Sequence, residues 1–159
     1  MQRDYAWSPK GIPAYVHSDK RLGKQASLLA SLSLEGITSS LLIEGSVDSE
    51  VFLYYLEQHL MPTICAGQLV IMDNCPIHLS ERVSELIVAK GAQVKFLPAY
   101  SPDLSPIEQA FAKIKPILKT FSAQCLEDLS MALKQAIDSI SLADIIGWFR
   151  DCGYRAHYL

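Results

Sequence analysis

The spacing of apolar and polar residues predicts the elements of this chain from residue 26 onward. Two short apolar runs, at 26–34 and 37–45, flank Glu35-Gly36, and this pattern is typical of a β-hairpin. Apolar residues then recur at helical spacing after Asp48, a good N-cap, and predict a helix over about 48–64. The continuous apolar run in 68–73 is typical of a strand that is covered on both faces.

The second half of the chain alternates in the same way. A helix is predicted over 80–91, with Ser80 as its cap and Gly91 as its stop, and a strand over 93–100. A proline-rich loop precedes a helical stripe formed by Ile107, Phe111, Ile114 and Leu118, which Pro116 is expected to kink or end. Two further helical segments follow, at 126–140 and 142–150. This order predicts an α/β fold in which helices flank both faces of a mixed sheet.

Composition narrows the class of protein. The chain has 159 residues, of which 50% are hydrophobic and 19% charged, as in a single soluble globular domain. The formal net charge is −3, so affinity for nucleic acid requires local basic patches. The best patch comprises Lys10, Lys20, Arg21 and Lys24. Four cysteines at no disulfide or zinc spacing, no membrane-spanning run and no signal sequence predict a cytoplasmic protein with reduced thiols.

Two acidic residues are expected to converge at one edge of the sheet. Asp73 ends one predicted strand, and Glu108 begins the helix that follows the next strand. Ligands of open α/β sheets bind outside the carboxyl ends of the strands. Such a carboxylate pair serves either acid–base chemistry or the binding of Mg²⁺ or Mn²⁺. The ordinary alternative is that both residues are turn-formers or helix caps.

Other side chains near this edge have weaker interpretations. Lys115 lies seven residues after Glu108 and falls near the same helix face, where it could meet phosphate or be solvated. Cys75 and His78, with Cys65 or Cys125, match no standard zinc pattern.

Two longer motifs resemble a known family. "VIMDNCPIH" followed by "FLPAYSPDLSPIEQAFAKIK" resembles the catalytic core of the mariner-type superfamily of DDE transposases, closest to the bacterial insertion-sequence branch. Positions 74 to 107, 34 residues, separate Asp73 from Glu108, which is the family's spacing between its second and third acids. "YAWSPKG" near the start and "WFRDCGY" near the end also resemble this branch.

The resemblance implies a ribonuclease-H-like fold and a Mg²⁺- or Mn²⁺-dependent DNA cleavage and strand-transfer activity. Asp73 and Glu108 would be the catalytic metal ligands. Asn74 and His78 would orient the carboxylate or contact DNA. The implied partners are transposon terminal inverted repeats and target DNA, with a homodimer as one assembly and no membrane.

The resemblance also defines what is expected to be missing. The family's first acid ends a central strand upstream, and neither Asp4 nor Asp19 follows an apolar run. Residues 1–159 are therefore expected to form one partial catalytic domain, truncated at its N-terminus, without the central strand or the helix-turn-helix region. We expect such a chain to be inert alone and marginally stable. The alternatives are a non-catalytic DNA- or transposase-binding remnant and, more remotely, an unrelated hydrolase.

Overall fold

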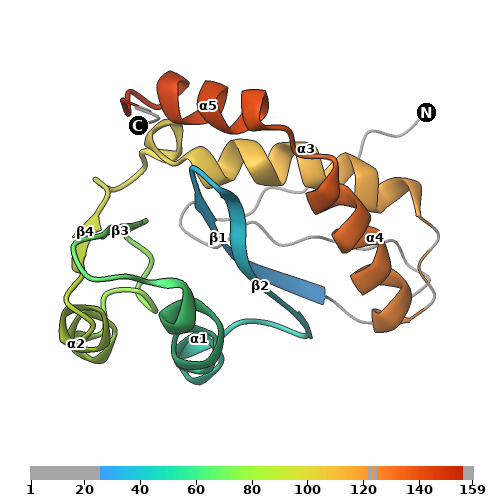
Figure 1. Ribbon diagram of the computed structural model, residues 1–159. Coiled ribbons are helices and arrows are strands. Elements are labelled where there is room, and N and C mark those ends of the chain that lie inside the picture. Colours follow the sequence, from blue (N-terminus) through green and yellow to red (C-terminus); the bar gives the residue numbers. More distant parts are fainter. Residues whose placement is uncertain (1–25, 122, 124, 156–159) are drawn as a thin grey trace.

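A β-hairpin lies at the centre of the molecule (Figure 1). The computed structural model describes residues 26–121, 123 and 125–155. Strands β1 (Ala26–Ser33) and β2 (Gly36–Glu44) pair antiparallel, as predicted, with Leu29 opposite Leu41. Gly36 has a φ of +117°, a conformation that few residues with a side chain adopt, which explains the glycine at this turn.

The two faces of the hairpin contact different helices. Alternate residues of a strand point to opposite faces. Leu29 and Leu41 accordingly pack into one apolar core, while Leu28 and Leu42 pack into another. The prediction of helices on both faces of a sheet is confirmed for this hairpin.

The first core lies between the hairpin, the helix that follows it and a second small sheet. Helix α1 (Ser49–Tyr55) starts at Asp48, whose Oδ1 accepts the N–H of Val51 at 2.9 Å, so the predicted cap is confirmed. The helix continues as a π-helical turn, η1 (Leu56–Leu60), and a 3₁₀ turn, η2 (Met61–Thr63). Buried members of this core include Phe52, Leu56, Leu60, Met72, Val83 and Ile87.

The second sheet comprises two parallel strands joined by a helix. Strand β3 (Leu69–Met72) pairs with β4 (Gln93–Phe96), and α2 (Glu81–Ala89) connects them. Among the described residues the strands form two separate two-stranded sheets, one antiparallel and one parallel. Strand β3 is also not covered on both faces: Leu69 is 51% exposed and only Met72 is buried, because a cavity runs along this strand.

The second core forms where two helices cover the other face of the hairpin. Helix α3 (Pro106–Thr120) follows the 3₁₀ turn η3 (Pro102–Leu104), and α4 (Leu126–Asp138) packs against it. The apolar stripe of α3 is confirmed, since Phe111, Ile114 and Leu118 are buried and Ile107 packs against them.

Pro116 was expected to kink or end helix α3, and the second of these outcomes is wrong. The helix continues to Thr120. A proline leaves the carbonyl four residues earlier without its helical partner, here that of Ala112. Because Ala112 and Pro116 are both exposed, water can satisfy that carbonyl and the helix is maintained.

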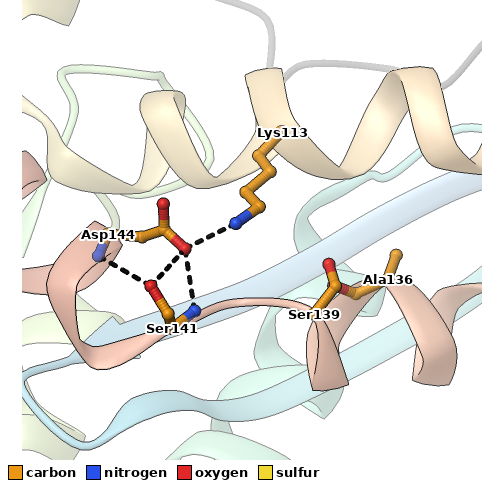
Figure 2. A network of polar contacts seen from close by, with 5 residues as sticks. All are labelled: Lys113, Ala136, Ser139, Ser141 and Asp144. Atoms are coloured by element: carbon orange, nitrogen blue, oxygen red, sulfur yellow. Dashed lines mark hydrogen bonds and ion pairs between the residues drawn. The ribbon is translucent and has the colours of Figure 1, made fainter.

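The last helix, α5 (Leu142–Asp151), lies alongside α3 (Figure 1). Ser141 and Asp144 form a capping box at its start, in which each side chain bonds the other residue's backbone N–H. Lys113 of α3 reaches the same Asp144 carboxylate and ties the two helices together (Figure 2). Within the described ranges, no helix is both long and apolar enough to span a membrane.

Candidate active site

A cavity of about 530 Å³ lies between the edges of strands β1 and β3. Its walls include residues 28–33 of β1 and 69–72 of β3. Asp73, directly after β3, and Glu108, in the first turn of α3, line the same cavity. The two acids that the sequence predicts to converge are therefore brought to one site.

Asp73 is held by partners from its own loop. Its Oδ1 accepts hydrogen bonds from Nδ1 of His78 at 2.6 Å and from the backbone N–H of Cys75 at 3.1 Å. Burial acts to raise the pKa of Asp73, but the hydrogen bond and charge of His78 and the N–H of Cys75 outweigh it and hold that pKa below its ordinary value. This carboxyl is thus ionised at neutral pH and fixed in one orientation.

His78 is in turn fixed by packing. Its side chain is 12% exposed, and its ring lies 4.4 Å, centroid to centroid, from that of Phe52 in α1. The imidazole links the Asp73 carboxylate to the first core. His78 thus contacts the Asp73 carboxylate directly, and its role in orienting that carboxylate stays a prediction.

Glu108 has a different environment. Its backbone N–H donates to the carbonyl of Ser105 at 3.1 Å, in the turn that starts α3. Burial raises the pKa of Glu108, the positive charge of Lys115 lowers it, and the negative charge of Asp73 raises it again, with a net raised value. The negative charge of Asp73 thus disfavours the ionised form of Glu108.

Lys115 lies seven positions after Glu108 on the same helix, α3. Burial lowers the pKa of this half-buried lysine, Glu108 raises it and the neighbouring charge of Lys119 lowers it. The positive charge of Lys115 partly balances Glu108, although Lys115 does not line the cavity.

The remaining sequence-predicted residues are less informative. Asn74 is exposed and does not line the cavity. The basic patch predicted from Lys10, Lys20, Arg21 and Lys24 lies outside the described residues.

Sequence reasoning missed two aromatic residues of the site. Phe149 of α5 and Tyr154 also line the cavity, and their rings meet edge to face at 6.0 Å. The hydroxyl of Tyr154 donates to the carbonyl of Leu104 at 2.8 Å. The motif "WFRDCGY" was a signal for them, but it indicated only a resemblance and gave no role.

The donor set can be tested against a metal ion. Asp73 and Glu108 offer the hard oxygen atoms that Mg²⁺ and Mn²⁺ prefer, and a cation between them would relieve their mutual repulsion. Over the described residues, no group of three or more His, Cys, Asp and Glu side chains is placed to hold a metal. The two carboxylates thus fit an ion that takes its other ligands from water and phosphate, and the zinc alternative at Cys75 gains no support.

The chain belongs to the DDE superfamily endonucleases, whose family model matches residues 1–130. Solved structures of the mariner transposase Mos1 are similar in fold. The Mos1 catalytic domain with raltegravir and Mg is 18% identical, with a TM-score of 0.69 over 87% of this chain and 73% of that chain. The Mos1 paired-end complex with the left transposon end is 20% identical, with a TM-score of 0.70 over 96% of this chain and 52% of that chain.

These likenesses confirm the ribonuclease-H-like fold class expected from the sequence. The chain spans about half the length of the Mos1 chain in the paired-end complex. No curated protein sequence matches it.

Proposed function

We propose that this chain is the catalytic core of a DNA transposase, in which Asp73 and Glu108 bind Mg²⁺ or Mn²⁺. One observation carries the proposal: two acids from separate family-like motifs line one cavity, one after a strand and one in the first turn of a helix. Neutral polar residues in place of the two acids would stabilise this edge of the sheet equally well. A Glu108 carboxyl whose pKa is raised by burial and by the charge of Asp73 is better explained by a cation that binds there.

The described residues near the cavity have different proposed roles. Both bonds to Asp73 involve Oδ1, so Oδ2 is the atom left to coordinate an ion. His78 orients this carboxylate, and Lys115 offsets the charge of Glu108 until an ion does so. When bound, the metal supplies Lewis-acid activation of a phosphodiester and of its attacking water or 3′-hydroxyl.

The proposed substrate is DNA. Mos1 has been solved in complexes with transposon ends and in a strand-transfer complex, and we extend both DNA partners, terminal inverted repeats and target, to this chain. Paired ends make a homodimer the assembly that we propose. Four free thiols, two of them exposed, agree with action in the cytoplasm.

A second candidate is a non-catalytic protein that binds DNA or a complete transposase. It is favoured by one observation: Glu35 also lines the cavity, but among the described residues no third His, Cys, Asp or Glu is placed to hold a metal together with Asp73 and Glu108. The two candidates share the metal site and differ in whether the chain cleaves DNA.

The metal site is tested by titrating the chain with Mn²⁺ and following the free ion by electron paramagnetic resonance. We expect Asp73→Asn and Glu108→Gln each to weaken Mn²⁺ binding by at least about tenfold, because each removes a charged ligand. Asp103→Asn is the matched control, since it removes an exposed carboxylate five positions before Glu108. Equal affinity in all four proteins would contradict the proposed site.

Cleavage separates the two candidates. A supercoiled plasmid that carries transposon ends is incubated with the chain and Mn²⁺, and nicked product is measured. Nicking that disappears in Glu108→Gln supports the transposase core. Mn²⁺ binding at Asp73 and Glu108 with no nicking supports the non-catalytic protein.

A further inference from the structure

The start of helix α3, which carries Glu108, has no cap of its own. Ser105 occupies the N-cap position, and its side chain makes no capping hydrogen bond. The backbone bonds of the preceding turn lie within residues 101–108, such as Ser105 N–H to the carbonyl of Pro102 at 3.0 Å. A change in this turn moves the Glu108 carboxylate, because the turn leads directly into the helix that carries it.

The C-terminal segment supplies the missing restraint. The hydroxyl of Tyr154 donates to the carbonyl of Leu104 at 2.8 Å, across 50 positions of sequence. This carbonyl belongs to the turn immediately before α3 and lies four residues ahead of Glu108. A single phenol therefore fixes the backbone from which the helix starts.

Two further contacts hold the same helix from the same side. Nε2 of Gln109 lies 3.5 Å from Sγ of Cys152. Nζ of Lys113 lies 2.5 Å from Oδ2 of Asp144, as Figure 2 shows. Together with the Tyr154 bond they reach α3 at its start, its first turn and its middle. Helix α5 and the residues directly after it thus restrain the half of α3 that carries Glu108.

Tyr154 is itself well placed to be rigid. Its backbone N–H donates to the carbonyl of Phe149 at 2.9 Å, and its ring packs edge to face on that of Phe149. Burial raises the pKa of Tyr154, so its hydroxyl stays protonated and remains a donor throughout the neutral range. Both rings line the cavity that contains Asp73 and Glu108.

We propose that Tyr154 is a positioning residue for Glu108: its hydroxyl holds the Leu104 turn, and through that turn it holds the Glu108 carboxylate opposite Asp73. This inference rests on the proposed metal site. Tyr154 touches neither the ion nor DNA in this proposal and acts through the backbone alone.

The test uses Tyr154→Phe in the full 159-residue chain, because this change removes the hydroxyl and retains the ring. We expect Mn²⁺ binding to weaken about tenfold, as for other residues that orient a ligand. Tyr54→Phe, an exposed tyrosine on α1, is the matched control and should bind Mn²⁺ like the wild type. Wild-type affinity in Tyr154→Phe would overturn the inference.

A double variant separates positioning from general loss of structure. If Tyr154 acts through Glu108, Tyr154→Phe has no further effect on Mn²⁺ binding once Glu108 is already Gln. An equal weakening in the wild-type and Glu108→Gln backgrounds would show a merely structural role and would overturn the inference.

Amide hydrogen exchange keeps the inference testable if the metal site fails. If Glu108→Gln binds Mn²⁺ like the wild type, the proposed function is wrong, but the restraint on the turn can still be measured without metal. We expect the Glu108 amide to exchange at least about tenfold faster in Tyr154→Phe, with the amides of α2 unchanged. Unchanged exchange at Glu108 would overturn the role of Tyr154 independently of any metal.

Discussion

The two acids of the site are supported in contrasting ways. Asp73 has partners within five residues of sequence, Cys75 and His78. The helix of Glu108 is held by contacts that span 31, 43 and 50 positions. One side of the site is thus built by its own loop, and the other depends on the last helix of the described chain.

The pKa values of the two acids also shift in opposite directions. Asp73 gains hydrogen bonds that favour its charged form, so its pKa is lowered. Glu108 is half-buried near another carboxylate, so its pKa is raised. The comparison teaches that one acid is preorganised as an anion, while the surroundings of the other disfavour its charged form.

The largest expected effects concern the two apolar cores that support these sides. Leu56, 0% exposed, belongs to the core beneath Asp73, and Ile114, 1% exposed, belongs to the core beneath Glu108. Leu56→Ala and Ile114→Ala should each lower the free energy of unfolding by about 2–5 kcal/mol, because each leaves a cavity in a packed core. Urea unfolding followed by circular dichroism measures this loss.

The same two variants test whether the sides unfold together. Both cores contact the central hairpin, so we expect one transition in each variant. Met131→Ala, at a position 61% exposed on α4, is the control and should change stability by less than about 0.5 kcal/mol. Two separate transitions would show that the core beneath Asp73 and the core beneath Glu108 unfold independently. The two acids would then not be held by one cooperative structure.

Local support is what sequence reasoning could predict. The strand before Asp73, the cap at Asp48 and the hairpin turn at Gly36 depend on neighbours a few positions away, and their patterns are visible in the chain. The long-range support of α3 depends on the hydrogen bond from Tyr154 to Leu104, which no spacing or periodicity in the sequence reveals. Pro116 was misjudged for a related reason, because its cost depends on the exposure of the carbonyl that it leaves unbonded.

The pairing of the strands was less visible in the sequence, although a missing central strand was expected to leave the hairpin apart from the strand of Asp73. Strand pattern shows that a segment is extended but not which edge it joins. Strand β3 has an apolar sequence that suggests packing on both faces, yet its residues line the cavity. The cavity is a property of the packed molecule, so its volume and its aromatic lining were beyond a reading of the sequence.

Substitutions of the two acids without metal should have effects of opposite sign. Asp73→Asn should lower the free energy of unfolding at pH 7 by about 1 kcal/mol, because the bonds from His78 and Cys75 weaken at a half-exposed site. Glu108→Gln should raise it by up to about 1 kcal/mol, because a buried charge beside Asp73 is removed. Thermal unfolding in a chelator measures both, with about 2–4 °C expected per kcal/mol.

The pH dependence has a defined sign on each side. The folded-state pKa of Glu108 is raised, so its contribution to stability is present at acid pH and is lost as the pH rises through that value. The folded-state pKa of Asp73 is lowered, so its contribution is present at neutral pH and is lost on acidification. Two variants that change stability in the same direction at pH 7 would remove the contrast between the acids.

The smallest effect is expected at the ion pair between α3 and α5. The hydrogen bond from Lys113, followed by those from Ser141, lowers the pKa of Asp144 to about 2. A lowered carboxyl pKa contributes stability that is present above its unfolded value, near 4, and is lost as the pH falls towards about 2. Lys113→Gln should therefore lower the unfolding temperature slightly at pH 5 and by less at pH 2, where the Asp144 carboxyl is already partly protonated.

This small effect bears directly on the contrast between the two sides. Lys134→Gln removes an exposed lysine from α4 and is the control for the loss of one positive charge. If only Lys113→Gln shows the acid-sensitive difference, the pair ties α5 to the helix of Glu108 and forms part of its distant support. Identical pH profiles for the two variants would mean that the pair is a surface contact of no consequence, as many are. The long-range support of α3 would then come from the contacts of Tyr154 and Gln109, at the end of the helix nearest the site.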